Sequence, residues 1–343
     1  MQPDSISQSR SSSAAIAKIP VEWRKALGLL AAASFALIVL TAREWGEMLH
    51  QWWNIDTYSH IILVPIIIGW LVALKFGELA QVVPRSWSPG LAIVAAGLGL
   101  WLMGRASEIN LIAHAGAVGM LQGMVIAAIG PRASMVLALP IAFGVFLVPF
   151  GDEIIPPLQA ITAEISIALT LWSGIPAEID GIYIDTPAGL FIVAEACSGV
   201  KFLIAMVTLA VLVCFTRFER WSHRALFILA SIVVPIVANG IRAWGTIYIA
   251  QSQGVEFAAG FDHIFYGWIF FAIVVALILA AAWRYFDREP ENYGWTADGV
   301  ARFALIRSME RFQSSAIVVF ACLAAMVILT AITASIVAPG ALG

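Results

Sequence analysis

Charged side chains are unusually scarce in this chain of 343 residues. Asp, Glu, Lys and Arg together make up only 12% of it, whereas hydrophobic residues make up 61%. A typical soluble domain is about 25% charged and about 45–50% apolar. A single water-soluble core cannot bury this much apolar surface, so lipid must be the solvent for much of the chain.

Cysteine and basic charge are also scarce. The three cysteines, Cys197, Cys214 and Cys322, are too few for a disulfide scaffold and too far apart for a zinc motif. The formal net charge of -3 offers no basic surface to nucleic acid. We therefore expect no metal site and no nucleic-acid partner.

A cleavable signal peptide is absent from the N-terminal region. Residues 1–25 are polar and rich in serine, and we expect them to be disordered and cytoplasmic. The apolar run after Arg24 and Lys25 is long enough to span a bilayer, and no small-residue cleavage site comes after it. We interpret this run as a signal anchor that stays in place.

Long apolar runs recur through the rest of the chain. A transmembrane helix needs about 20 mostly apolar residues, within a range of about 17–25. These runs predict an all-α fold, a polytopic integral membrane bundle of nine spans with a cytoplasmic N-terminus. The predicted spans are residues 26–42, 58–74, 90–103, 111–129, 134–150, 199–215, 225–250, 263–283 and 316–337.

Segment 156–173 is ambiguous, because polar residues interrupt its apolar sequence. Lysine and arginine accumulate in the cytoplasmic loops of membrane proteins. If 156–173 does not cross, only Arg43, Arg105, Lys201 and Arg242 lie outside the cytoplasmic segments; if it crosses, this asymmetry vanishes. We therefore predict that segment 156–173 does not cross the bilayer and instead lies on, or dips into, the outer face of the membrane.

This topology divides the chain into four regions. The disordered N-terminus (1–25) precedes a transmembrane domain (26–283), a cytoplasmic linker or amphipathic segment (284–315) and a C-terminal transmembrane helix with its tail (316–343). Within the transmembrane domain, segments 174–198 and 251–262 face the periplasm. Segment 178–193 has two short apolar stretches on either side of a turn and predicts a short hairpin above the membrane.

Arg242 lies inside an otherwise apolar run. A charge at the centre of a span costs about 2.5–3.5 kcal/mol on insertion scales, and it marks a functional site by default. The alternative is an arginine that snorkels to the outer headgroups, since the span ends a few residues later. Asn239 lies one helical turn earlier, near the same face, where it is placed to orient the guanidinium.

Cys197 lies where a periplasmic loop becomes a transmembrane helix. The unpaired N–H groups at a helix N-terminus stabilise a thiolate, which is the nucleophilic form of cysteine. A cysteine near a membrane helix is, taken alone, more often a small packing residue. Cys214 and Cys322 lie within apolar runs, and we interpret both as packing residues.

His263 opens a span from the outer side, with Asp262 before it as a candidate N-cap. A nucleophilic cysteine needs a base to activate it and an acid to protonate the leaving amine, and histidine serves both needs. His60 also starts a span from the outer face, and His114 lies a short way inside one. Each of these histidines has a structural alternative, in which a neighbouring backbone carbonyl holds the ring.

Several segments carry a resemblance to a known family. The sequences Ala196-Cys197-Ser198-Gly199 and Asn239-Gly240-Ile241-Arg242, with His263 at the head of a later span, resemble an exosortase of the exosortase/archaeosortase family. Upstream, Asp56-Thr57-Tyr58-Ser59-His60 is similar to the family's early motif. The resemblance covers about residues 53–283.

The resemblance implies that Cys197 is the nucleophile, Arg242 the stabilising cation and His263 the acid/base group. Supporting site residues on this basis are Asn239, Ser198, Glu195, Asp262, His60 and Tyr58. It also implies a cysteine transpeptidase of the bacterial inner membrane that needs no cofactor. Its substrates are secreted proteins with a C-terminal sorting tail: a short Pro-Glu-Pro-type motif, one transmembrane helix and a basic end. The acceptor, an envelope glycan or a lipid, is open.

Three other function classes compete with this interpretation. A transporter or channel would use Arg242 to bind an anion, and it predicts further intramembrane charges and broken helices. A membrane acyltransferase would use Cys197 without a peptide substrate. An assembly subunit would tolerate replacement of Cys197, Arg242 and His263 one at a time.

Overall fold

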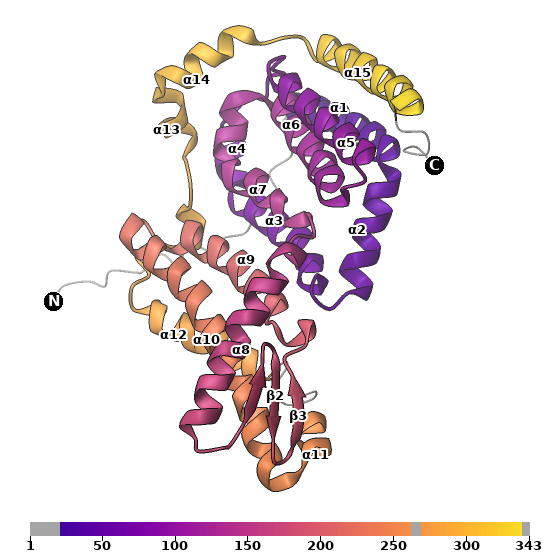
Figure 1. Cartoon of the computed structure of the whole chain (residues 1–343). Coiled ribbons are helices and arrows are strands. Elements are labelled where there is room, and N and C mark those ends of the chain that lie inside the picture. Colours follow the sequence, from indigo (N-terminus) through magenta and orange to yellow (C-terminus); the bar gives the residue numbers. More distant parts are fainter. Residues whose placement is uncertain (1–20, 262–268, 338–343) are drawn as a thin grey trace, which may run out of the picture.

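The computed structural model describes residues 21–261 and 269–337, and helices dominate it (Figure 1). One group of helices comprises α1 to α7 and α15. A second group comprises α8 to α12, with a small sheet at one end. The helices of the first group are α1 (Val21–Leu40), α2 (Ala42–Asn54), α3 (Val64–Leu74), α4 (Phe76–Leu79), α5 (Gly90–Ala106), α6 (Asn110–Val136), α7 (Ala138–Phe143) and α15 (Ala316–Val337). Those of the second are α8 (Ile155–Trp172), α9 (Val200–Arg217), α10 (Trp221–Gln253), α11 (Val255–Phe261) and α12 (Phe271–Trp283).

Glycines bring α5 and α6 together at the centre of the first group. A Cβ added to Gly97 would lie 2.7 Å from the backbone nitrogen of Met120, and one added to Gly116 would lie 2.4 Å from that of Trp101. Small residues let membrane helices approach this closely, and packing replaces the hydrophobic driving force that lipid removes. The result is a rigid pair, against which α1 and α15 pack.

The helical, polytopic character of the protein is confirmed, whereas the nine-span count stays a prediction. In the part of the chain that the structure describes, six helices are long and apolar enough to cross a bilayer, or up to seven if a bent pair counts as one. That pair joins α2 to residues 59–74 through a bend of 109°. The predicted span 134–150 is not a continuous helix. It breaks into the end of α6, α7 and a 3-10 turn, η2 (Gly144–Leu147), because Leu137 leaves the helical conformation at φ -94° and ψ 21°, and Pro140 cannot donate to the carbonyl oxygen of Val136.

Segment 156–173 forms α8, which runs along α10. Near its start, Leu158 packs against Ile204 of α9 and Ile236 of α10. Further along, the Ser166 hydroxyl donates to the carbonyl oxygen of Gly240 at 3.3 Å. α8 therefore packs lengthwise against α10 through both apolar and polar side chains. Residues 152–172 are also among the six helices that are long and apolar enough to cross a bilayer, so the prediction that 156–173 does not cross stays a prediction.

A three-stranded antiparallel sheet comes after α8 and contains the predicted hairpin. Its strands, in the order β1-β2-β3, are β1 (Glu178–Asp180), β2 (Tyr183–Thr186) and β3 (Gly189–Ile192). Ile184 of β2 is fully buried against Ala163 of α8 and Ile247 of α10. We call this end of the second helical group, where Figure 1 shows the sheet beside α11, the sheet end.

Segment 284–315 begins at the end of the second helical group that lies away from the sheet, and we call this end the strap end (Figure 1). It contains α13 (Ala297–Arg302) and α14 (Ala304–Met309). The Asp287 carboxylate accepts from the backbone N–H of Glu219, between α9 and α10, at 2.7 Å. The Tyr293 hydroxyl donates to the carbonyl oxygen of Leu71 in α3 at 2.7 Å. Burial raises the pKa of Tyr293, so this donor stays protonated and the segment ties the two helical groups together.

Candidate active site

Cys197 lies in a tight turn between the sheet and α9. It ends a 3-10 turn, η4 (Glu195–Cys197), and its backbone N–H donates to the carbonyl oxygen of Ala194 at 2.8 Å. Its side chain is partly exposed and packs against the cluster that contains Ile184 and Ile247. The predicted position of Cys197, where a loop enters a membrane helix, is confirmed.

Gly199 makes this turn possible. It is the N-cap of α9 and adopts φ 79°, a left-handed conformation that costs other residues about 1–2 kcal/mol. A Cβ at this position would lie only 2.7 Å from Cγ of Asn239. Glycine is therefore required at position 199 for two reasons: the backbone conformation of the turn and the close approach of α10.

We expect Gly199→Ala to impair both stability and activity. The added methyl must displace Asn239, which overpacks the site by about 1–3 kcal/mol beyond the conformational cost. Gly174→Ala is a matched control, because Gly174 has φ 77° but nothing within 4 Å of an added Cβ. The unfolding temperatures of both variants in detergent, measured beside the wild type, check this prediction. Equal losses would show that the contact with Asn239 has no energetic role.

Asn239 connects α10 to the Cys197 turn. Its Nδ2 donates to the carbonyl oxygen of Cys197 at 2.7 Å and to Oγ1 of Thr162 at 3.1 Å. Asn239 is 4% exposed, so both bonds lie in a water-poor environment. Its Oδ1 has no hydrogen-bond partner among the described residues. One buried amide thus holds three segments together: the Cys197 turn, α8 and α10.

Arg242 lies one turn beyond Asn239 on α10 and is partly buried. Both residues line a small cavity, closed on its other sides by Phe202 of α9 and by Phe271 and Val274 of α12. The walls of this cavity are mostly aromatic and aliphatic, and a cation beside such low-dielectric walls acts more strongly on nearby charge than a cation in water does. The structure places Arg242 inside the three-helix group formed by α9, α10 and α12.

Two further predicted residues flank Cys197 in sequence. Ser198 is buried, and its Oγ accepts from the backbone N–H of Val200 in the first turn of α9 at 3.4 Å. Glu195 opens η4 and is exposed. Ser198 therefore stabilises the start of the helix, and Glu195 faces away from the packed interior.

His60 lies in the turn η1 (Ser59–Leu63), and Tyr58 is the residue before this turn. The Tyr58 hydroxyl donates to the Asp152 carboxylate, just before α8, at 2.6 Å. Nδ1 of His60 lies 3.1 Å from the carbonyl oxygen of Thr57, so a backbone group holds the ring. Gly151, the residue before Asp152, lies so near α9 that an added Cβ would clash with the side chain of Ile204. This turn is therefore anchored near the first turns of α9.

The other predicted residues have different outcomes. Asp262 and His263 lie outside the described residues. Cys214 is buried, with its thiol donating to the carbonyl oxygen of Arg224 at 3.5 Å, so its interpretation as a packing residue is confirmed. Cys322 is exposed on α15, and its interpretation as a packing residue is wrong. An apolar run looks the same in sequence whether a side chain faces protein or lipid.

Sequence reasoning missed Thr162 and Gln159 of α8. Thr162 binds Asn239, and Nε2 of Gln159 donates to the carbonyl oxygen of Val193, just before the Cys197 turn, at 2.6 Å. The signal was the spacing of the polar residues, because Thr162, Ser166 and Thr170 recur every four residues and are all buried. Such a stripe indicates a helix face turned toward polar partners.

Taken together, the site holds a partly exposed thiol on a rigid turn, with a cation on a neighbouring helix. No group of three or more His, Cys, Asp or Glu side chains that could hold a metal occurs within residues 21–261 and 269–337. The arrangement suits attack by sulfur on a carbonyl, with stabilisation of the resulting oxyanion.

Comparison with known proteins gives a family match for most of the chain. Residues 52–280 match the family described as transmembrane exosortase. Comparisons with curated proteins and with solved structures gave no match. The matched segment includes the Tyr58–His60 turn, the Cys197 turn, α8 and Arg242. The chain therefore belongs to the transmembrane exosortase family, a family of membrane cysteine transpeptidases.

Proposed function

We propose that this protein cleaves the C-terminal sorting tail of secreted proteins and transfers them to an acceptor. Cleavage takes place at the periplasmic surface of the bacterial inner membrane, at the sheet end. Cys197 is the nucleophile, Arg242 stabilises the oxyanion, and His263 is the acid/base group. The substrate is a membrane-anchored protein whose tail crosses the bilayer once.

The hydrogen bond from Asn239 to the carbonyl oxygen of Cys197, at 2.7 Å, carries this proposal. It joins the nucleophile turn directly to the helix that holds Arg242. An arginine that only snorkels to the lipid headgroups needs no fixed position relative to Cys197, because any conformation that brings its charge to the headgroups is sufficient. Catalysis does need it, since the cation has to be held in a fixed position relative to the sulfur.

The reaction proceeds through two acyl transfers. The Cys197 thiolate attacks the scissile carbonyl carbon, and the carbonyl electrons move to oxygen, where the Arg242 guanidinium stabilises the negative charge. As the oxyanion collapses, the C–N bond breaks and His263 protonates the departing amine. A thioester links the secreted protein to Cys197. Water, or an amine or hydroxyl of the acceptor, then attacks the thioester and releases the thiolate.

Co-expression with a tailed reporter tests this function. The reporter is a secreted protein that carries the C-terminal tail of a protein from the same genome. Its size is measured by immunoblot, and mass spectrometry of the product identifies the new C-terminus. Wild-type protein should shorten the reporter at the start of the tail helix. An unchanged reporter would favour the transporter class.

Two histidine variants complete the experiment. His263→Ala should stop the shortening, whereas His60→Ala should reduce it less, because the His60 ring is held by the Thr57 carbonyl. Each variant is compared at an equal amount in the membrane. The reverse order of effects would assign the acid/base role to His60.

A further inference from the structure

An apolar groove runs along the seam between α10 and α12. Its volume is about 520 Å³, and residues from both helices line it, among them Leu226, Ala230, Val234, Leu277, Ala281 and Tyr285. We call it the α10–α12 groove. It begins beside His223 and Tyr285, close to the strap end, and extends toward the middle of both helices.

The groove faces outward from the bundle. Leu226 is 66% exposed and Leu277 is 64% exposed, although both are large apolar residues on membrane helices. In a bilayer these side chains contact lipid or another membrane helix. The groove therefore takes an apolar occupant from within the membrane.

The two helices that form the groove also reach the candidate active site. Beyond Val234, α10 carries Asn239 and Arg242, and the corresponding end of α12 contributes Phe271 and Val274 to the cavity around them. From His223 to Arg242 the helix rises by about 28 Å at 1.5 Å per residue. The hydrocarbon core of a bilayer is about 30 Å thick. The groove lines the part of this path nearest the strap end, from His223 to Val234, and an occupant that continues along α10 reaches the level of Arg242.

Small side chains shape the groove for a helix. Ala230 on α10, and Ala281 and Ala282 on α12, line it between larger residues. Small residues in membrane helices allow a second backbone to approach closely, and this gain in packing is what drives helix association in lipid. An acyl chain gains much less from such a surface, because it is flexible and loses entropy when it is held straight.

We propose that the α10–α12 groove binds the transmembrane helix of the substrate's tail. The inference rests on the proposed function and adds the docking surface that delivers the scissile bond. A helix seated there presents the residues at its outer end to Cys197, whose carbonyl oxygen is bound by Asn239 of the same α10. Docking within the membrane holds the scissile bond at a fixed position relative to Cys197 before the reaction begins.

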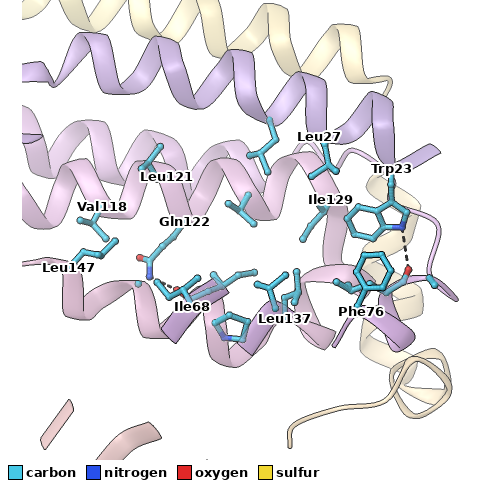
Figure 2. A pocket seen from close by; sticks show the side chains of 18 residues that line it. Trp23, Leu27, Ile68, Phe76, Val118, Leu121, Gln122, Ile129, Leu137 and Leu147 are labelled. Atoms are coloured by element: carbon cyan, nitrogen blue, oxygen red, sulfur yellow. Dashed lines mark hydrogen bonds between the residues drawn. The ribbon is translucent and has the colours of Figure 1, made fainter. Parts of the chain in front are cut away.

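A second apolar groove lies elsewhere in the molecule (Figure 2). It has a volume of about 390 Å³, and Trp23, Phe76, Val118 and Leu147 are among the residues around it. All of its lining residues belong to the first helical group. None comes from α9, α10 or α12, so a tail bound there would not be aligned with Cys197.

The first test fills the groove with a larger side chain. Ala281→Trp should slow reporter shortening about tenfold, because the indole occupies the space that the tail helix needs. Ala276→Trp is the matched control, since Ala276 is exposed on the same helix and does not line the groove. Equal rates for the two variants, at equal amounts in the membrane, would overturn the docking proposal.

The second test does not depend on activity. Leu226 is replaced by the photo-reactive residue p-benzoylphenylalanine in the Cys197→Ala protein, and the uncleaved reporter is co-expressed and irradiated. Leu329 of α15, which is 65% exposed, receives the same replacement as the control. An adduct with the reporter tail at position 226 and none at 329 supports the proposal. Equal adducts at both positions, or adducts with lipid alone at 226, overturn it.

The two proposals fail in different ways. If the wild type shortens the reporter but Leu226 gives no tail adduct, docking in the groove is wrong and the proposed function stands. If the wild type never shortens the reporter, the proposed function is wrong and the docking proposal falls with it.

Discussion

Replacing Cys197 by alanine is expected to abolish reporter shortening, with a loss of at least about a thousandfold. In the proposed mechanism the Cys197 sulfur attacks the scissile carbonyl, and neither of the other two cysteines is placed to substitute for it. Cys214 is buried near the strap end, and Cys322 is on the surface of α15 in the other helical group. Cys214→Ala and Cys322→Ala are therefore the matched controls, and both should retain shortening close to that of the wild type.

The covalent intermediate gives an independent measurement of the same residue. Wild-type protein should form a reporter adduct that hydroxylamine releases, because hydroxylamine attacks thioesters. Cys197→Ala protein should form none. Continued shortening by Cys197→Ala would assign the nucleophile to another group, and an adduct that carries lipid in place of reporter would favour the acyltransferase class.

Replacing Arg242 by alanine should reduce the rate of shortening about 100- to 1000-fold, as loss of an oxyanion donor does in other enzymes. The loss should be large because Arg242 is partly buried in a cavity lined by Phe202, Phe271 and Val274, whose low-dielectric walls strengthen its effect on nearby charge. Arg242→Lys should recover only part of the rate, since lysine keeps the charge but not the planar, forked donor.

Lys201 provides the control for a cation near the site. It lies in the first turn of α9, with its Nζ 5.2 Å from the centre of the Phe202 ring. Lys201→Ala should change the rate of shortening only slightly, because its ammonium is not held by the turn that contains Cys197. If Arg242→Ala has an effect as small as that of Lys201→Ala, Arg242 is a snorkelling residue and not part of the reaction.

Thr162 illustrates why only part of the site could be predicted. Cys197, Asn239 and Arg242 were found from their own positions: a cysteine at a helix start and polar groups in an apolar run. Thr162 lies 77 residues from its partner Asn239, and nothing in either local sequence specifies that pairing. The pairing depends on how α8 packs against α10, which is a property of the whole bundle.

The predicted span 134–150 shows the same limit in the fold. Its hydropathy is that of a membrane helix, but α6 ends at Val136, and α7 begins at Ala138 with Pro140 in its first turn, which cannot donate to the carbonyl oxygen of Val136. Residues 138–147 then form only short helical pieces. A sum of side-chain hydropathies reports the solvent that a segment prefers and not the path of its backbone.

The helical membrane character of this protein follows from the sequence alone, because so few charges and so much apolar surface exclude a water-soluble core. The positions of the candidate catalytic groups along the chain follow from it as well, since a thiol at a helix start and an arginine in an apolar run are local features. The surroundings of these groups become visible only in the folded protein: the bond from Asn239 to Cys197, the polar face of α8, and the groove between α10 and α12. These depend on packing between distant segments, and apolar residues read alike in sequence whether they face protein, lipid or a partner helix.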